Sequence, residues 1–185
     1  MNRRKIMIGV IIGSAALSVV ALAGMASHYA IPRDDEDDDG NDGGRTAVVR
    51  ALRFAKVTLQ QGLSASELEG QPLSAKFEVD RGSFQLSVYT SKDGRFSEVL
   101  VDYSTGNIAK VRAITEGDDL ATAQSQRAVM AKAKAGLKQA VDKATGEAPG
   151  FRVVAVIPNL KGGRAVASVL FFKGEESKIV NQMLD

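Results

Sequence analysis

The chain has 185 residues, with 24 Lys and Arg against 22 Asp and Glu, one His, and no Cys or Trp. Without cysteine it can form no disulfide, thiol nucleophile or thiolate zinc site, and a single histidine cannot supply a histidine-based zinc site. The net charge of +2 is a sum over oppositely charged segments, so each segment is considered in turn.

Residues 1–30 carry the pattern of a bacterial export signal. Positions 3–5 are basic, and positions 6–26 are uncharged and mostly apolar. This run is close to the ~20 residues that span a bilayer, while positions 24–26 offer small residues for cleavage. The sequence therefore predicts either a cleaved signal peptide or a retained membrane anchor. In both cases the rest is exported to the periplasm or the extracytoplasmic face of the inner membrane, and without cysteine it is no lipid-modified lipoprotein.

Residues 31–45 form an acidic segment with six consecutive Asp and Glu residues. Such a segment repels itself and has nothing to bury, so we expect a disordered linker. Asp35, Asp37 and Asp39 also match the first half of a calcium-binding loop, although Thr46 stands where such a loop needs a bidentate Glu. A calcium-responsive linker is the alternative to a solvated spacer.

Residues 46–115 predict a helix followed by antiparallel strands. Apolar residues recur every three or four positions, which indicates one amphipathic helix that ends near Gly62. Its inward stripe is Val48, Leu52, Ala55, Leu59 and Leu63. From Ser74 the period changes to two, which predicts half-buried strands joined by turns at Gly82 and Gly94.

The stretch VLVDYSTGNIAKV, from Val99 to Val111, is predicted to be the last hairpin of this first meander. The chain reverses between Ser104 and Asn107, with a bulge on the returning strand. Carboxylates in such turns commonly accept hydrogen bonds from nearby backbone amides, and we expect this of Asp102. A ligand or metal role for this carboxylate is the alternative.

Residues 116–185 repeat this order of elements. A second helix follows Asp118 and Asp119, the N-cap candidates, and its LKQAV echoes the LQQGL of the first helix. Its inward residues are Met130, Ala133, Leu137, Val141 and Ala144. Alternating strands follow. A unit of this size buries too little apolar surface to be stable alone. We therefore expect an α+β fold in which both units pack as one body.

The first unit resembles the PepSY family. Its VLVDYSTGNI is similar to the V-x-V-D-x-x-T-G-x-V ending of PepSY domains, with Val101, Asp102, Thr105 and Gly106 on the motif. The second unit matches in element order and lacks the Asp and the Thr-Gly, so the resemblance describes two PepSY-like repeats, the second divergent. It implies a non-catalytic extracytoplasmic module, of a kind found in bacterial envelope proteins and in propeptides of thermolysin-type metallopeptidases. Such modules are proposed to inhibit or modulate peptidases.

The sequence predicts no enzyme and no cofactor. The patterns G-x-S-x-G, S-x-x-K, H-E-x-x-H, G-x-x-x-x-G-K and G-x-G-x-x-G are absent, and no histidine follows position 45 to act as a base. We expect instead an envelope protein or peptidase as the partner, bound through an exposed sheet edge.

A basic surface on the second helix gives an alternative function. Five basic residues fall on its outer side: Arg127, Lys132, Lys134, Lys138 and Lys143. A surface of one charge sign attracts anionic lipid or another envelope polyanion. Export argues against nucleic acid, and an uncleaved N-terminal segment would add membrane association.

Overall fold

The computed structural model describes residues 42–185; the expected signal or anchor and the calcium candidates Asp35, Asp37 and Asp39 lie outside the described residues. The described chain forms four helices and seven strands. The helices are α1 (Asp42–Leu52), α2 (Leu59–Ser66), α3 (Gly117–Met130) and α4 (Leu137–Gly146). The strands are β1 (Gln71–Asp80), β2 (Ser83–Lys92), β3 (Arg95–Val101), β4 (Ile108–Ile114), β5 (Arg152–Lys161), β6 (Arg164–Lys173) and β7 (Glu176–Met183).

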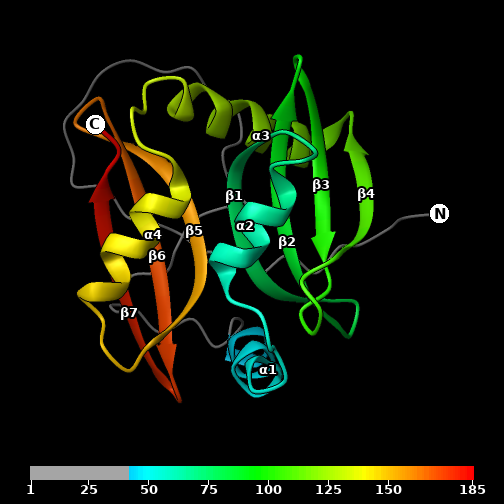
Figure 1. Cartoon of the computed structure of the whole chain (residues 1–185), viewed down its shortest axis with the longest axis vertical. Coiled ribbons are helices and arrows are strands. Elements are labelled where there is room, and N and C mark those ends of the chain that lie inside the picture. Colours follow the sequence, from blue (N-terminus) through cyan, green and yellow to red (C-terminus); the bar gives the residue numbers. More distant parts are fainter. Residues whose placement is uncertain (1–41) are drawn as a thin grey trace.

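The described strands form one antiparallel sheet in the order β4-β3-β2-β1-β5-β6-β7 (Figure 1). The predicted α+β class is confirmed. The two halves of the chain meet in the middle of the sheet, where β1 pairs with β5 through Ala75↔Val156 and Lys76↔Ala155. Buried residues of both halves, such as Val88 and Val169, belong to one hydrophobic core cluster.

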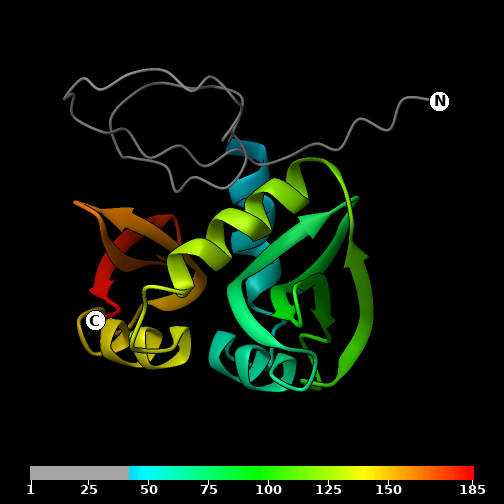
Figure 2. The same ribbon diagram turned by 90° about the horizontal axis from the view of Figure 1, so that it is seen from above.

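The helices cover the sheet in corresponding places in the two halves. α2 and α4 lie side by side on one side of the sheet, whereas α1 and α3 lie at opposite ends of its central strands (Figures 1 and 2). Each half therefore contains two helices followed by a meander. The meanders also correspond in detail, because the opening pairs are Gln71↔Ser91 and Arg152↔Phe172, and the bulges fall between Pro72 and Ser74 and between Val153 and Ala155.

The prediction of a single first helix is wrong. α1 begins at Asp42, inside the segment expected to be a disordered linker, and ends at Leu52; α2 begins after a short break. Thr58 starts α2 with a capping box, in which its hydroxyl accepts from the Gln61 backbone N–H and its own N–H donates to the Gln61 side chain. The chain therefore restarts its helix at Thr58 in a new direction.

Gly62 does not end a helix, as had been expected, but lies inside α2. A Cβ atom there would come within 2.3 Å of Leu86 Cδ2 on β2. Leu86 is fully buried, so the glycine allows α2 to approach the sheet closely. In the second half, Ala140 on α4 and Ala167 on β6 occupy the corresponding positions, a larger helix residue over a smaller strand residue.

The second helix is also two helices. α3 ends at Met130 and α4 begins after Gly136, its N-cap. The N-cap of α3 is Glu116, not Asp118 or Asp119, both of which lie in the first turn, where their negative charge is favourable for the helix dipole. Both halves therefore have a break between two helices at the corresponding place. The apolar pattern continues across each break, so the pattern alone predicts one helix.

Candidate binding surfaces

The PepSY-like motif forms a closed turn between β3 and β4. Asp102 Oδ1 accepts hydrogen bonds from the N–H groups of Thr105 at 2.7 Å and Ser104 at 2.8 Å, and from the Thr105 hydroxyl at 3.1 Å. These bonds, with the Thr105 backbone N–H first, lower the pKa of Asp102 below its ordinary value of 3.8. Gly106 has a φ of +80° and closes the turn by donating its N–H to the Asp102 carbonyl. The carboxylate is thus engaged by its own turn, the arrangement that the sequence predicts.

This turn also forms hydrogen bonds with the segment between α1 and α2. The N–H groups of Lys56 and Val57 donate to the carbonyl of Tyr103 at 2.8 Å and 3.2 Å. A Cβ at Gly106 would lie 3.3 Å from Val57 Cγ1, so the glycine is part of the same close contact. Val101, the first motif residue, is buried on β3. The motif therefore acts within the fold as the place where strand, turn and helix junction meet.

The second half makes the same junction without the motif. The N–H groups of Lys134 and Ala135 donate to the carbonyl of Leu184, at the end of β7, just as Lys56 and Val57 donate to Tyr103. A backbone carbonyl is sufficient for this contact. The missing Asp and Thr-Gly of the second half therefore do not change how its helices dock.

The five predicted basic residues do not lie on one helix. Arg127 is on α3, where its guanidinium lies over the Phe96 ring at 5.9 Å, Lys132 and Lys134 are in the break, and Lys138 and Lys143 are on α4. Lys138 forms an ion pair with Asp142 at 3.2 Å. The continuous basic helix face that was expected for lipid binding is therefore divided over three segments.

The described sheet has two edges, β4 and β7. The middle of β4 is exposed throughout and carries Lys110 and Arg112, and charged residues on an edge discourage pairing. On β7, Lys178 instead donates to the carbonyl of Glu147, next to α4. Arg112 on β4 is likewise paired, with Glu98 at 3.2 Å, so the two edges differ in charge by Lys110 on β4.

The backbone direction along β7 follows from one hydrogen bond. Leu184 N–H donates to the Ala165 carbonyl of β6. Because backbone groups of successive residues alternate in direction, Val180 and Gln182 also face β6, while Ile179 and Asn181 direct their N–H and C=O groups to the free side. In the described chain, no strand pairs with that side.

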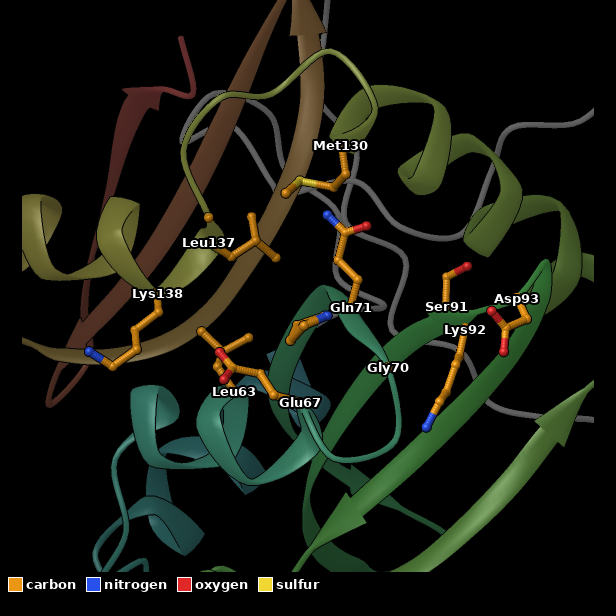
Figure 3. A pocket seen from close by; sticks show the side chains of 12 residues that line it. Leu63, Glu67, Gly70, Gln71, Ser91, Lys92, Asp93, Met130, Leu137 and Lys138 are labelled. Atoms are coloured by element: carbon orange, nitrogen blue, oxygen red, sulfur yellow. The ribbon is translucent and has the colours of Figure 1, made fainter.

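A cavity of about 630 Å³ lies between the two halves (Figure 3). It is lined by the end of α2, the start of β1, the turn between β2 and β3, and the break between α3 and α4. Leu63 and Glu67 line it from α2, and Met130 and Leu137 line it from the opposite side. The side chain of Gln71 extends between them toward Met130.

The corresponding place in the other half is filled by Arg152. Its Nη1 donates to the carbonyl of Leu52 at 2.7 Å, and its Nη2 donates to those of Ala55 at 2.6 Å and Val57 at 3.1 Å. Burial lowers the pKa of Arg152, but a guanidinium remains charged in proteins. The first β5 residue thus ties the second half to the break between α1 and α2.

Residues 42–185 have neither a metal-binding cluster nor a membrane-spanning helix. These residues contain no group of three or more His, Asp or Glu side chains placed to hold a metal ion. None of their helices is both long enough and apolar enough to cross a bilayer. Neither finding bears on residues 1–41.

Comparison with known proteins leaves the family open. No family model matches the chain, and no curated protein matches it. A solved structure from Clostridium difficile 630, provisionally described as a lipoprotein, is similar with 14% identity and a TM-score of 0.39, over 65% of this chain and 79% of that chain. At this level neither fold nor function is inferred from the similarity, and the PepSY resemblance stays a prediction.

Sequence reasoning missed the cavity. The match of LQQGL to LKQAV relates residues that are 78 positions apart, whereas the strand registers relate Gln71 to Arg152 and Ser91 to Phe172, which are 81 positions apart. The second half therefore has three more residues between its last helix and its first strand, and the helix match alone does not identify the counterparts of the cavity residues. The paired strands show the contrast, with small and uncharged residues in one half and two phenylalanines and an arginine in the other.

Proposed function

We propose that this chain is a non-catalytic, exported PepSY-type module of the bacterial envelope that binds a protein partner by adding a strand to its sheet. The PepSY resemblance favours a peptidase as the partner, and the export pattern of residues 1–30 favours the periplasm or the extracytoplasmic face of the inner membrane. Strand addition gives affinity through backbone hydrogen bonds and needs little sequence specificity.

This proposal rests on a difference between two corresponding strands. One has a neighbouring strand on its outer side, and the other has none among the described strands. β3 and β7 occupy the same position in the two halves, third in their meanders. The outer side of β3 is paired with β4, for example through Val99↔Val111, whereas no described strand lies on the outer side of β7. A partner strand beside β7 would occupy the place that β4 occupies in the first half.

Co-purification from an envelope extract tests the proposal with a matched pair of variants. Ile179→Pro removes one outward N–H, and proline is tolerated on an edge strand when its missing donor faces away from the sheet. Ile179→Thr keeps that donor and a β-branched side chain. We expect the proline variant to lose the protein partner and the threonine variant to retain it.

Two results would contradict strand addition. One is a partner retained equally by both variants when circular dichroism shows both to be folded. The other is retention by anionic vesicles with no protein partner, which would favour the lipid alternative and its basic residues. That alternative then predicts loss of vesicle binding on replacing Lys132 and Lys134, which lie exposed in the break between α3 and α4.

A further inference from the structure

The cavity exists because the residues of its wall are small at positions where the other half of the chain has large side chains. Gly70, Gln71 and Ser91 occupy the positions that correspond to Phe151, Arg152 and Phe172. Phe172 is buried and Phe151 is half-buried, so the three residues of the second half fill their site. A Cβ at Gly70 would lie 2.7 Å from the Ser91 carbonyl oxygen, which keeps this side of the cavity open.

The carbonyl groups that bind Arg152 have counterparts in the break between α3 and α4, next to the cavity. In the break between α1 and α2, the Leu52 carbonyl accepts from the Ala55 N–H and from Arg152; in the break between α3 and α4, the Met130 carbonyl accepts from the Ala133 N–H in the same way. The counterparts of the Ala55 and Val57 carbonyls are those of Ala133 and Ala135, which lie in the chain between the lining residues Met130 and Gly136 and do not line the cavity themselves. Neither accepts a hydrogen bond from the residues that the structure describes. The break next to the cavity thus repeats the positions of the Arg152 acceptors without a guanidinium from the described chain.

Two acidic side chains, Glu67 and Asp93, line the cavity together with the basic Lys92 and Lys138. The side chain of Gln71 lines the cavity, is shorter than that of arginine and forms no hydrogen bond with another side chain of the described residues. The carboxylate of Glu67 lines the cavity and forms no ion pair there with any described residue, whereas Lys138 on the opposite side is paired with Asp142. A charge-assisted hydrogen bond to a guanidinium would use both the open acceptors and this carboxylate.

The space next to these acceptors suits an aromatic ring. In the second half, Lys173 lies over the Phe151 ring at 5.6 Å from its centroid. Lys92, its counterpart, lines the cavity beside Gly70, where the chain itself has no ring to offer. A guest ring there would receive the same cation–π contact.

We infer that this cavity binds an arginine side chain of a partner peptide, with an aromatic residue directly before it, in the place that Phe151 and Arg152 fill in the other half. This site is separate from the β7 edge and does not depend on the proposed strand addition. It is a recognition pocket for a Phe-Arg type sequence.

Titration of the full-length protein with N-acetyl-Phe-Arg-amide, followed by NMR in a mild detergent, tests the inference. We expect saturable shifts at Met130, Ala135 and Gly136, and at least about tenfold weaker binding of the citrulline analogue, which is uncharged and nearly the same size. Gln71→Arg should fill the cavity from within, abolish binding and raise the melting temperature. Gln71→Met, which is similar in length and uncharged, should keep binding.

Several results would overturn the inference. These are the absence of saturable shifts, equal binding of the citrulline analogue, and unchanged binding by Gln71→Arg. If that variant does not fold, Glu67→Gln replaces it, since loss of the carboxylate should weaken arginine binding and leave citrulline binding unchanged; equal effects on the two peptides would contradict the site. A second copy of the chain is the competing occupant, because Arg53 stacks on the exposed Phe54, an arginine and an aromatic ring in the reverse order. Shifts at Met130 that follow protein concentration without peptide, and vanish with Arg53→Ala, would assign the cavity to self-association.

Discussion

The carboxylate of Asp102 accepts two backbone N–H groups and one hydroxyl from the turn that follows it. The pKa of this group is therefore lower in the folded chain than its ordinary value of 3.8. A carboxyl of this kind stabilises the fold above its unfolded pKa, and this contribution is lost as the pH falls through its folded pKa. The hydrogen bonds to Asp102 thus give the motif a structural role in stabilising its turn.

The first prediction concerns the charge of this residue. Asp102→Asn keeps a side-chain oxygen but loses the negative charge that the backbone N–H groups favour. The wild-type protein should be more stable than the variant at about pH 6, and the two should converge as the pH falls below about 3.8. Urea unfolding at several pH values measures this. A difference in the free energy of unfolding that does not change with pH would contradict the account.

The helices show what an apolar period can and cannot predict. Leu52, Leu59 and Leu63 are buried as the predicted stripe requires, yet they belong to two helices. The period continues across the break because both helices pack on the same core, so the stripe alone does not reveal a change of direction. The capping box of Thr58 and Gln61 was the local signal for the break, and Gly136 was the corresponding signal in the second half.

The second prediction concerns the close approach of α2 to β2. Gly62→Ala places a Cβ against the buried Leu86 and should cost about 1–3 kcal/mol of unfolding free energy by overpacking, as measured by thermal or urea denaturation. Leu86→Ala alone should cost about 2–5 kcal/mol by leaving a cavity. The double variant reproduces the Ala140 and Ala167 pair of the second half. Its cost should be smaller than the sum of the two single costs, and strict additivity would contradict the pairing.

The molecule as a whole has two halves joined by one sheet, by one hydrophobic core and by side-chain hydrogen bonds such as those of Arg152. Arg152, at the start of β5, binds three carbonyls around the break between α1 and α2, so the second unit holds the first in place. The α+β class and the antiparallel meanders could be predicted from periodicity and turn residues. The cavity could not, because it follows from Gly70, Gln71 and Ser91 being small relative to partners that only the paired strands identify.

The third prediction concerns this connection. Arg152→Met leaves the carbonyls of Leu52, Ala55 and Val57 without their donor and should cost about 2 kcal/mol, while Arg152→Lys should recover part of that loss. Because one core spans both units, unfolding should remain a single transition in all three proteins. NMR signals of Val88 and Val169 followed in urea check this. Midpoints that differ between the two residues in the wild-type protein would show two independent domains.

Amide hydrogen exchange along β7 tests the open edge on which the proposed function depends. In the free protein, the N–H groups of Val180 and Gln182 should exchange slowly because they face β6, while those of Ile179 and Asn181 should exchange fast. Addition of the co-purified partner should slow Ile179 and Asn181 specifically. Slow exchange at all four positions in the free protein, or no change at Ile179 and Asn181 with the partner bound, would contradict strand addition at β7.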